Sequence, residues 1–498
     1  MSAQGGKSDG GRERDQRILK LEKLRDMGID PYPYAFERTH TIEGVIGAEK
    51  ELSEKETSVS LAGRVMAIRK HGHTAFGNLK DATGSIQFYI RDDQVEENLF
   101  EQFGLLDVGD LIGISGTLFR TRTGELTVKI GRLELLGKAL LPLPEKWHGL
   151  SNKEIRYRRR YVDLIVNDDV VDVFRTRSRI VEEIRKFLIE RDFLEVETPI
   201  LQPLYGGAMA RPFVTHHNAL DIDLYLRIAD ELYLKRLIVG GLERVFEFSK
   251  DFRNEGMDRS HNPEFTMLEC YAAYWDYLGM MDFVEAMFSR LCEKIVGGHQ
   301  LTFQGTEIDL SPPWRRSAFF DLIAGATGVD MKGMEESELE RVCRERDLDV
   351  EGVAGRGGYL DLIFSELVEP NLVQPTFVMD YPLELSPLAK VHRSEPGLVE
   401  RFEPYICGFE VGNAFSELND PIDQRERFEH QAQMRAAGAD EVHPIDEDYI
   451  RALEYGMPPT GGLGIGVDRL VMLLTDSPSI RDVIFFPQMR PEEGLTED

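Results

Sequence analysis

A change in the spacing of apolar residues divides the chain at Leu141-Pro142-Leu143-Pro144. Before this boundary, from about residue 58, apolar and polar residues alternate as they do in half-buried strands. After it, segments with helical spacing alternate with strand-like segments up to the C-terminus. The 498 residues are also too many for one compact core. The sequence therefore predicts an α+β protein with several domains.

Five strands are predicted before the boundary, with turns at Thr83-Gly84 and Thr123-Gly124. Five short strands suit a small barrel of the oligonucleotide-binding (OB) type, although a small sandwich gives much the same pattern. Ahead of them, residues 1–12 are expected to be disordered, and a helix is predicted from Glu13 to Met27, ended by Gly28. The expected strands are 58–70, 75–80, 85–91, 110–120 and 125–136.

The predicted domains are a disordered tail with a helical extension at 1–57, the barrel at 58–145 and a larger domain at 146–498. Near its start the larger domain has a basic run, 156–161, which is either a solvated helix face or a contact for RNA phosphates. The sequence contains no GxxxxGK[ST] loop and no GxGxxG between a strand and a helix. Any use of ATP must therefore proceed without a P-loop or a Rossmann fingerprint.

Composition limits the location and the partners of the chain. The N-terminal segment is polar and no stretch approaches the roughly 18 apolar residues of a membrane helix, so a cytoplasmic protein without a membrane partner is expected. The net charge of −29 argues against non-specific binding to long duplexes, and no DNA partner is expected, but a local RNA-binding patch stays possible. The four cysteines form no CxxC pair, which predicts buried thiols rather than a zinc site or disulfides.

A charged loop between two predicted strands is the most informative part of the chain. Val245–Phe252 and Thr266–Tyr271 both alternate like strands, so the segment between them closes a hairpin. Such a loop is usually a solvent-exposed turn with salt bridges. This one also combines arginines able to bind a phosphate in bidentate fashion with an aromatic ring, Phe265, able to stack on a base. The charged residues in and around the loop are Arg253, Glu255, Arg259, His261, Glu264 and Glu269.

A glycine-rich strand is predicted near the C-terminus. Gly462, Gly464 and Gly466 alternate along it and leave one of its faces without side chains, and Arg469 then opens an apolar helix. The bare face allows either a ligand or another backbone to come close, and the glycines alone do not distinguish the two.

Three glutamates recur at intervals of seven residues, at Glu403, Glu410 and Glu417. In a helix they would form a solvated stripe, but Pro404 and Gly408 disfavour a helix here. Acidic residues inside an apolar strand require a cation to offset the cost of their burial. Oxygen ligands of this kind suit Mg²⁺ that carries substrate phosphates.

Together these stretches resemble the signature motifs of class II aminoacyl-tRNA synthetases. Phe193–Pro199, with the amphipathic helix predicted before it at 178–191, resembles motif 1, Phe252–Glu255 resembles the core of motif 2, and Gly462–Arg469 resembles motif 3. Asp468 departs from the class, which often has Glu there. The stretches that resemble the lysyl branch of the class are 205–213, 215–218 and 413–419.

The resemblance runs from about Arg14 to Arg490 and implies both a fold and a reaction. It implies an anticodon-binding OB barrel followed by a catalytic domain whose antiparallel sheet is flanked by helices. It further implies a homodimer built through motif 1, with ATP, L-lysine and tRNA(Lys) as substrates and up to three Mg²⁺ ions per active site. Lysine would be activated to the adenylate and then transferred to the 3'-terminal ribose of the tRNA.

The resemblance also implies roles for single residues. Phe265 and Arg469 would enclose the adenine, Glu255 would recognise its amine, and Arg253 would hold the α-phosphate together with the lysine carboxylate. Arg253 and Arg469 are therefore the implied catalytic residues, and Glu403 and Glu410 are the implied Mg²⁺ ligands. The implied ATP-binding residues are Arg253, Glu255, His261, Asn262, Phe265, Glu403 and Arg469.

A lysine side chain needs carboxylates for its ammonium group and an aromatic wall along its stem. A site for aspartate would need arginine or lysine instead. His216 and His217 lack a cysteine or a third histidine nearby, so we expect them to be structural rather than metal ligands. The pocket residues implied by the resemblance are Gly207, Glu231, Glu269, Tyr271, Asn413, Phe415 and Glu417, an acidic set.

In the barrel, the resemblance assigns the central anticodon base to Arg69, Phe76 and Gln87, with Glu125 as a further anticodon contact. Phe76 would stack on a splayed base while the other two side chains bond its edge. The alternative is that Phe76 belongs to the core, but its small or polar neighbours favour exposure.

Three alternative functions are disfavoured by the sequence. A lysyl transferase acting on a protein typically lacks the barrel, an enzyme for aspartate or asparagine conflicts with the acidic pocket, and an inactive paralogue would have lost phosphate or metal residues that this chain retains. The acidity itself suggests adaptation to high ionic strength, because a dense acidic surface stays hydrated and soluble there.

Overall fold

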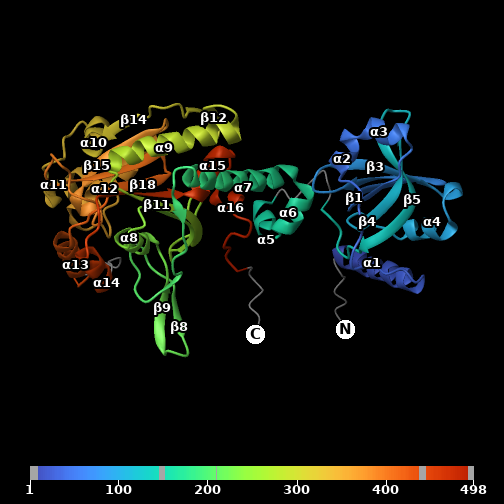
Figure 1. Ribbon diagram of the computed structural model, residues 1–498, viewed down its shortest axis with the longest axis horizontal. Coiled ribbons are helices and arrows are strands. Elements are labelled where there is room, and N and C mark those ends of the chain that lie inside the picture. The colour runs from blue at the N-terminus through green and yellow to red at the C-terminus, as the bar shows by residue number, and fades with distance from the viewer. Residues whose placement is uncertain (1–8, 145–151, 209, 437–444, 492–498) are drawn as a thin grey trace, which may run out of the picture. The chain divides into compact units, whose positions relative to one another are not determined.

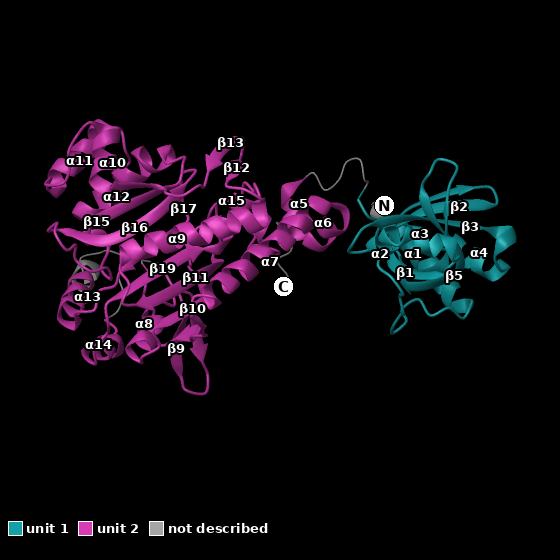
Figure 2. Ribbon diagram, turned by 45° about the horizontal axis from the view of Figure 1, so that its top comes forward, with its two compact units in different colours: residues 1–151 teal, residues 152–498 magenta. Residues whose placement is uncertain are grey.

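The structure is a computed structural model that describes residues 9–144, 152–208, 210–436 and 445–491 (Figure 1). The chain divides into two compact units, 1–151 and 152–498, coloured teal and magenta in Figure 2. Some predictions fall outside the described residues: residues 1–8 of the tail, the predicted boundary at 145 and Met209 in the stretch 205–213.

The first unit is built around a closed barrel with strand order β1-β2-β3-β5-β4. Closure excludes the sandwich alternative and confirms the predicted OB barrel. Alternate residues point inward, so Leu61, Phe88 and Ile112 are buried in one core. The strands are β1 Val59–His71, β2 Thr74–Lys80, β3 Ser85–Arg91, β4 Leu111–Arg120 and β5 Leu126–Gly137.

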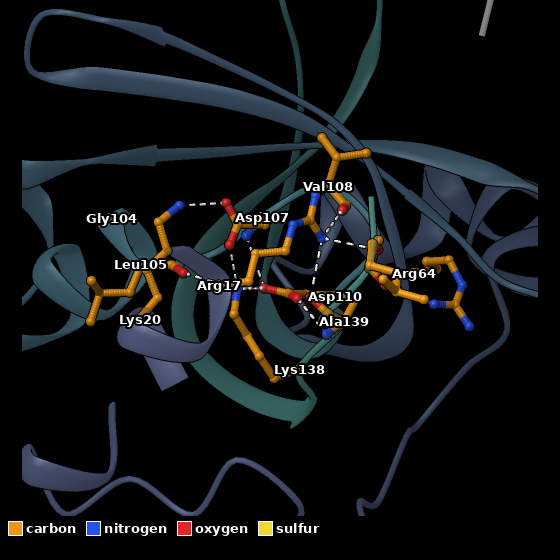
Figure 3. Close-up of polar contacts among 12 residues, drawn as sticks. Arg17, Lys20, Arg64, Gly104, Leu105, Asp107, Val108, Asp110, Lys138 and Ala139 are labelled. Carbon is orange, nitrogen blue, oxygen red and sulfur yellow. Dashed lines mark hydrogen bonds and ion pairs between the residues drawn. The ribbon is translucent and has the colours of Figure 1, made fainter. Parts of the chain in front are cut away.

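Helix α1, Asp9–Asp26, is attached to the barrel by a buried polar network (Figure 3). The Arg17 guanidinium donates to the carbonyl oxygens of Val108 and Ala139 at 3.0 and 3.1 Å. Beside it the buried Lys138 ammonium lies 2.8 Å from Asp110. The helix begins four residues before its predicted start, because extending an existing helix by a turn costs far less than starting one. The other helices of this unit are α2 Ile42–Gly47, α3 Glu49–Glu54 and α4 Glu97–Gly104.

The second unit is centred on a nine-stranded mixed sheet with the order β14-β15-β16-β18-β19-β11-β10-β6, and β17 pairs with β16. Its interior pairs are antiparallel as predicted, but β14 with β15 and β10 with β6 are parallel. The strands are β6 Leu194–Glu195, β10 Arg244–Phe252, β11 Glu264–Ala273, β14 Arg315–Ala318, β15 Thr376–Pro382, β16 Leu398–Ile406, β17 Phe409–Glu410, β18 Gly412–Ser416 and β19 Thr460–Gly466. Two small sheets contain β7 Leu201–Gln202, β8 Val214–His217 and β9 Ile222–Leu226, and β12 Gln300–Phe303 and β13 Thr306–Asp309.

Helices α7, Asp168–Ile189, and α9, Tyr277–Leu291, cover one face of this sheet (Figure 1). Ile184 of α7 and Met287 of α9 share a core with Phe246 and Leu268 of the sheet. Helix α7 begins ten residues before the predicted start at Ser178, because Val170 and Phe174 extend its buried stripe. The remaining helices are α5 Lys153–Arg158, α6 Arg160–Val166, α8 Glu231–Val239, α10 Phe319–Thr327, α11 Glu336–Glu345, α12 Gly355–Leu367, α13 Pro421–Ala436, α14 Glu447–Glu454, α15 Val467–Leu474 and α16 Ile480–Val483.

The basic run 156–161 is partly structural, which corrects the interpretation of a solvated helix face. Arg160 is fully buried, donates to Asp163 at 2.7 Å and bonds the backbone of α16. Of the four cysteines, all free thiols, three are buried as predicted and Cys407 is half-buried. Of the helices in the described ranges, none has the length and apolar character needed to span a membrane.

Candidate active site

The sheet face opposite α7 and α9 carries the predicted site residues. On β11, Leu268 and Cys270 enter the core beneath the helices, so Glu269 and Tyr271 point the other way. The same alternation places Phe402 in the core and Glu403 on the opposite face. The period of two therefore turns a run of mixed residues into one functional surface.

This face forms the floor of a cavity of about 430 Å³. Fourteen of the fifteen residues predicted for this site line it, and the exception is Glu417, which lies behind the wall. The fourteen are Gly207, Glu231, Arg253, Glu255, His261, Asn262, Phe265, Glu269, Tyr271, Glu403, Glu410, Asn413, Phe415 and Arg469.

One part of the cavity is basic and aromatic. The Arg253 guanidinium lies 5.0 Å from the centre of the Phe265 ring. Arg469 donates to the Glu410 carbonyl at 2.7 Å and contacts Nε2 of His261 at 3.1 Å. Arg253 Nε is buried and donates no hydrogen bond to any described residue. An arginine with a free donor beside an aromatic ring suits the phosphate and base of a nucleotide.

Glu403 and Glu410 lie next to this basic part. Glu403 is buried and accepts hydrogen bonds from the Tyr381 and Tyr405 hydroxyls at 2.6 and 2.9 Å. Loss of solvent and the neighbouring Glu403 charge raise the pKa of Glu410. Burial and the Glu410 carboxylate likewise raise the pKa of Glu369 to about 7. Carboxylates that repel one another in this way fit a divalent cation, which neutralises them.

A buried ion triplet stands behind the acidic part of the pocket. Lys235 has no exposed side-chain surface, lies 2.5 Å from Glu231 Oε1 and is also in direct contact with Glu417 Oε2. Burial opposes the charge of Lys235, but the two carboxylates outweigh it and hold the pKa of the ammonium well above its usual value. Lys235 therefore offsets part of the negative charge of the predicted lysine pocket.

Close packing fixes the shape of the pocket wall. A Cβ on Gly462 would lie 1.9 Å from Glu417 Oε1, so this glycine admits the carboxylate rather than a ligand. Gly207 adopts a φ of +90°, a conformation that other residues rarely take, and a Cβ there would lie 3.2 Å from Cβ of Glu231. The Tyr271 hydroxyl donates to Glu269 Oε2 at 2.9 Å.

Three residues of the site escaped the sequence analysis. Lys235 follows Glu231 by four residues, a spacing that predicts an ion pair on one face of a helix. Arg401 alternates with Glu403 and bonds Asn413 at 3.0 Å. Glu369 lies in a turn far from the other site residues in the sequence, and no motif around it indicates a role in the site. Asp468, noted as a departure from the class, forms an ion pair at 2.6 Å with Arg177 of α7 and so has a structural role.

The candidate anticodon residues share the outer face of the barrel. Arg69 pairs with Phe76 across β1 and β2, and Asn78 pairs with Gln87 across β2 and β3. Phe76 is half-buried with its ring 4.9 Å from that of Tyr89, so it is not a core residue. Gln87 accepts a hydrogen bond from Thr127, and Glu125 is exposed just before β5.

The two histidines considered as metal ligands lie on β8, away from any described cluster of three ligands. His216 is 2.9 Å from Asp223 across the hairpin, in an exposed ion pair. His217 accepts a hydrogen bond from the Leu220 amide. Both histidines therefore make local contacts within the β8–β9 hairpin.

Comparison with known proteins agrees with this geometry. The model for tRNA synthetases class II (D, K and N) matches residues 152–490, and the model for the OB-fold nucleic acid binding domain matches residues 59–136. Lysine–tRNA ligases are similar along nearly their whole length. The one from Carboxydothermus hydrogenoformans is 54% identical over 96% of this chain and 98% of its own, and the one from Roseiflexus sp. (strain RS-1) is 54% identical over 96% and 99%.

The resemblance found in the sequence is thus confirmed at the level of the family and of both folds. The residues that carry it, from Arg253 to Arg469, meet in one cavity on the open face of the sheet. The chain belongs to the family of class II tRNA synthetases (D, K and N).

Proposed function

We propose that this chain is a lysine–tRNA ligase, which activates L-lysine with ATP and transfers it to tRNA(Lys). The observation that carries the proposal is the continuity of one cavity from an arginine and aromatic part to an acidic part. The acidic part suits an ammonium group, and similar proteins over almost the full length are lysine–tRNA ligases. Residues 58–145 would bind the anticodon and residues 146–498 would perform catalysis.

In this proposal the chain acts by holding two substrates in reactive positions. Arg253 binds the α-phosphate and the lysine carboxylate, which brings the attacking oxygen in line with the phosphorus. Phe265 and Arg469 enclose the adenine, Glu255 bonds its amine, and His261 and Asn262 contact the nucleotide. The positive charges of the two arginines stabilise the charge that spreads over the phosphate oxygens.

The metal of the reaction is proposed to be Mg²⁺, with up to three ions in each site. Glu403 and Glu410 would hold it, because their mutual repulsion favours a bound cation. Bound Mg²⁺ would neutralise phosphate charge. Glu410→Gln should raise the Mg²⁺ concentration needed for half-maximal activity about tenfold, whereas the exposed Glu447→Gln should leave it unchanged.

The amino-acid pocket would bind lysine through its carboxylates. Glu231, Glu269 and Glu417 would supply negative charge, with Gly207, Tyr271, Asn413 and Phe415 shaping the wall. In the barrel, Phe76 would stack on an anticodon base, with Arg69, Gln87 and Glu125 bonding around it. We further propose a homodimer formed through motif 1, acting in the cytoplasm.

The deciding experiment is amino-acid-dependent exchange of pyrophosphate into ATP, with all twenty amino acids and without tRNA. Exchange with lysine alone supports the proposal. Exchange with aspartate or asparagine would overturn the pocket assignment while keeping the family, and no exchange at all would favour an inactive paralogue.

A further inference from the structure

Three buried carboxylates meet just behind the amino-acid pocket. Asp230, Asp251 and Glu269 each place one oxygen within 4.8 Å of the other two, and all three side chains are buried. Glu269 lines the cavity, whereas Asp230 and Asp251 do not. The group is separate from Glu403 and Glu410, the carboxylates proposed to bind Mg²⁺.

Two of these carboxylates, Asp230 and Asp251, lack most of the partners that buried charges normally have, whereas Glu269 accepts a hydrogen bond from the Tyr271 hydroxyl. Asp230 Oδ2 and both oxygens of Asp251 accept no hydrogen bond from any residue in the described ranges. Asp230 precedes helix α8 at the capping position, where aspartate usually accepts a backbone N–H, but its side chain makes no such bond. Its Oδ1 receives a long contact of 3.4 Å from Ser249, and its carboxyl group also lies within hydrogen-bonding reach of Glu269.

The nearest positive group is already matched. Arg227 donates to Glu247 at 2.7 Å and approaches Asp251 only at 3.4 Å. Glu247 is further satisfied by the Thr198 hydroxyl at 2.7 Å. The charge of Arg227 is therefore shared between Glu247 and Asp251, and Arg253 is a further positive neighbour of Asp251. The three carboxylates together with Glu247 still exceed the positive charge of these two arginines.

We propose that Asp230, Asp251 and Glu269 bind one divalent metal ion of the Ca²⁺ or Mg²⁺ class, in a site distinct from the nucleotide-bound metal. Carboxylate oxygens lie about 2.3–2.6 Å from Ca²⁺, so two oxygens bound to one ion are at most about 5 Å apart. Oxygens that all lie within 4.8 Å of one another can therefore reach the same ion. The ion fixes the Glu269 carboxylate that faces the pocket. The inference does not depend on the proposed reaction.

Bound protons could neutralise the three carboxylates in place of a metal ion. Burial raises the pKa of Asp230 to about 8, with a further contribution from the Asp251 charge, and burial raises the pKa of Asp251 to about 6. A bound ion displaces those protons, because metal ligands must be ionised. Metal binding near pH 7 should accordingly release protons into the buffer.

The test uses the full chain after removal of metals with a chelator, without ATP, amino acid or tRNA. Equilibrium dialysis against Ca²⁺ or Mg²⁺ counts the ions bound to the wild type and to Asp230→Asn, Asp251→Asn, Glu410→Gln and Asp192→Asn. Asp192 is an exposed aspartate outside the cluster and serves as the matched control. We expect Asp230→Asn and Asp251→Asn each to bind one ion fewer than the wild type, with Asp192→Asn unchanged. Glu410→Gln should retain the ion that these two variants lose.

Thermal unfolding provides a second readout, since both Asn variants remove repulsion and should fold. Ca²⁺ or Mg²⁺ should raise the Tm of the wild type and of Asp192→Asn but not that of Asp251→Asn. Equal ion counts in the wild type and Asp251→Asn would overturn the proposal. The proposal would also be overturned if no divalent ion bound and the Tm depended on pH, because that result indicates that the carboxylates share protons. Binding of K⁺ alone at constant ionic strength would overturn it as well. Pyrophosphate exchange is measured separately, so either proposal can fail without the other.

Discussion

Lys235 Nζ lies 2.5 Å from Glu231 Oε1, and both side chains are almost completely withdrawn from solvent, at 0% and 6% exposure. The same ammonium contacts Glu417, so one internal cation holds two of the carboxylates proposed to recognise lysine. The protein thus supplies part of the neutralisation that a substrate ammonium would otherwise provide. This relationship makes Lys235 a positioning residue, since it does not line the cavity.

Replacing Lys235 by Met should raise the KM for lysine at least tenfold, because Glu231 and Glu417 lose the buried cation that holds both in position, with a smaller change in the KM for ATP. Removing one partner of a buried pair costs about 3–5 kcal/mol, so the Tm should also fall. Lys235→Arg retains the charge and should restore part of the affinity. Lys250→Met, at a lysine of β10 whose side chain is 42% exposed, is the matched control. Equal changes in both KM values would show a merely structural role.

Phe76→Ala should lower kcat/KM for aminoacylation of tRNA while pyrophosphate exchange stays at the wild-type rate. Loss of one base–aromatic stack costs about 1–3 kcal/mol, which corresponds to roughly a 5- to 150-fold loss. Tyr34→Ala, at a fully exposed aromatic residue of the same unit, should have no effect. A matching decline in exchange would place the defect in folding rather than in tRNA recognition.

The raised pKa of Glu369 predicts a specific dependence of stability on pH. The folded protein keeps the proton up to about pH 7, whereas the unfolded chain releases it near its usual value of 4.5. Between these values the folded state binds more protons, so stability falls as pH rises. In metal-free buffer the Tm of the wild type should therefore decrease relative to that of Glu369→Gln from about pH 5 to pH 7.

The control for this comparison is Glu366→Gln, at an exposed glutamate of α12. Its Tm difference from the wild type should stay constant over the same range. A constant difference for Glu369→Gln as well would contradict the assignment.

The net charge of −29 predicts that stability and lysylation increase from low to molar KCl. Salt screens the mutual repulsion of surface carboxylates, and the screening length falls to about 3 Å at 1 M. The measurement is Tm and aminoacylation rate across a KCl series, with choline chloride as a second salt. Unchanged values in both series would exclude adaptation to high ionic strength.

The sequence by itself determined the elements and most members of the site. Alternation with a period of two predicted the five barrel strands to within a few residues, because each strand has one buried face. The resemblance to class II synthetases implied fourteen residues that do line one cavity. The face of a strand on which a residue lies follows from the alternation of its neighbours in the sequence, so it can be predicted from a short local segment.

Only the tertiary structure decided which charges compensate one another. Glu417 was predicted beside the substrate but lies behind the wall, where Gly462 leaves space and Lys235 pairs with it. Glu369 joins Glu403 and Glu410 from a distant turn, and Asp230 meets Asp251 and Glu269 from a different element. Electrostatic energy depends on distance and burial, and neither is fixed until strands far apart in the chain pack together.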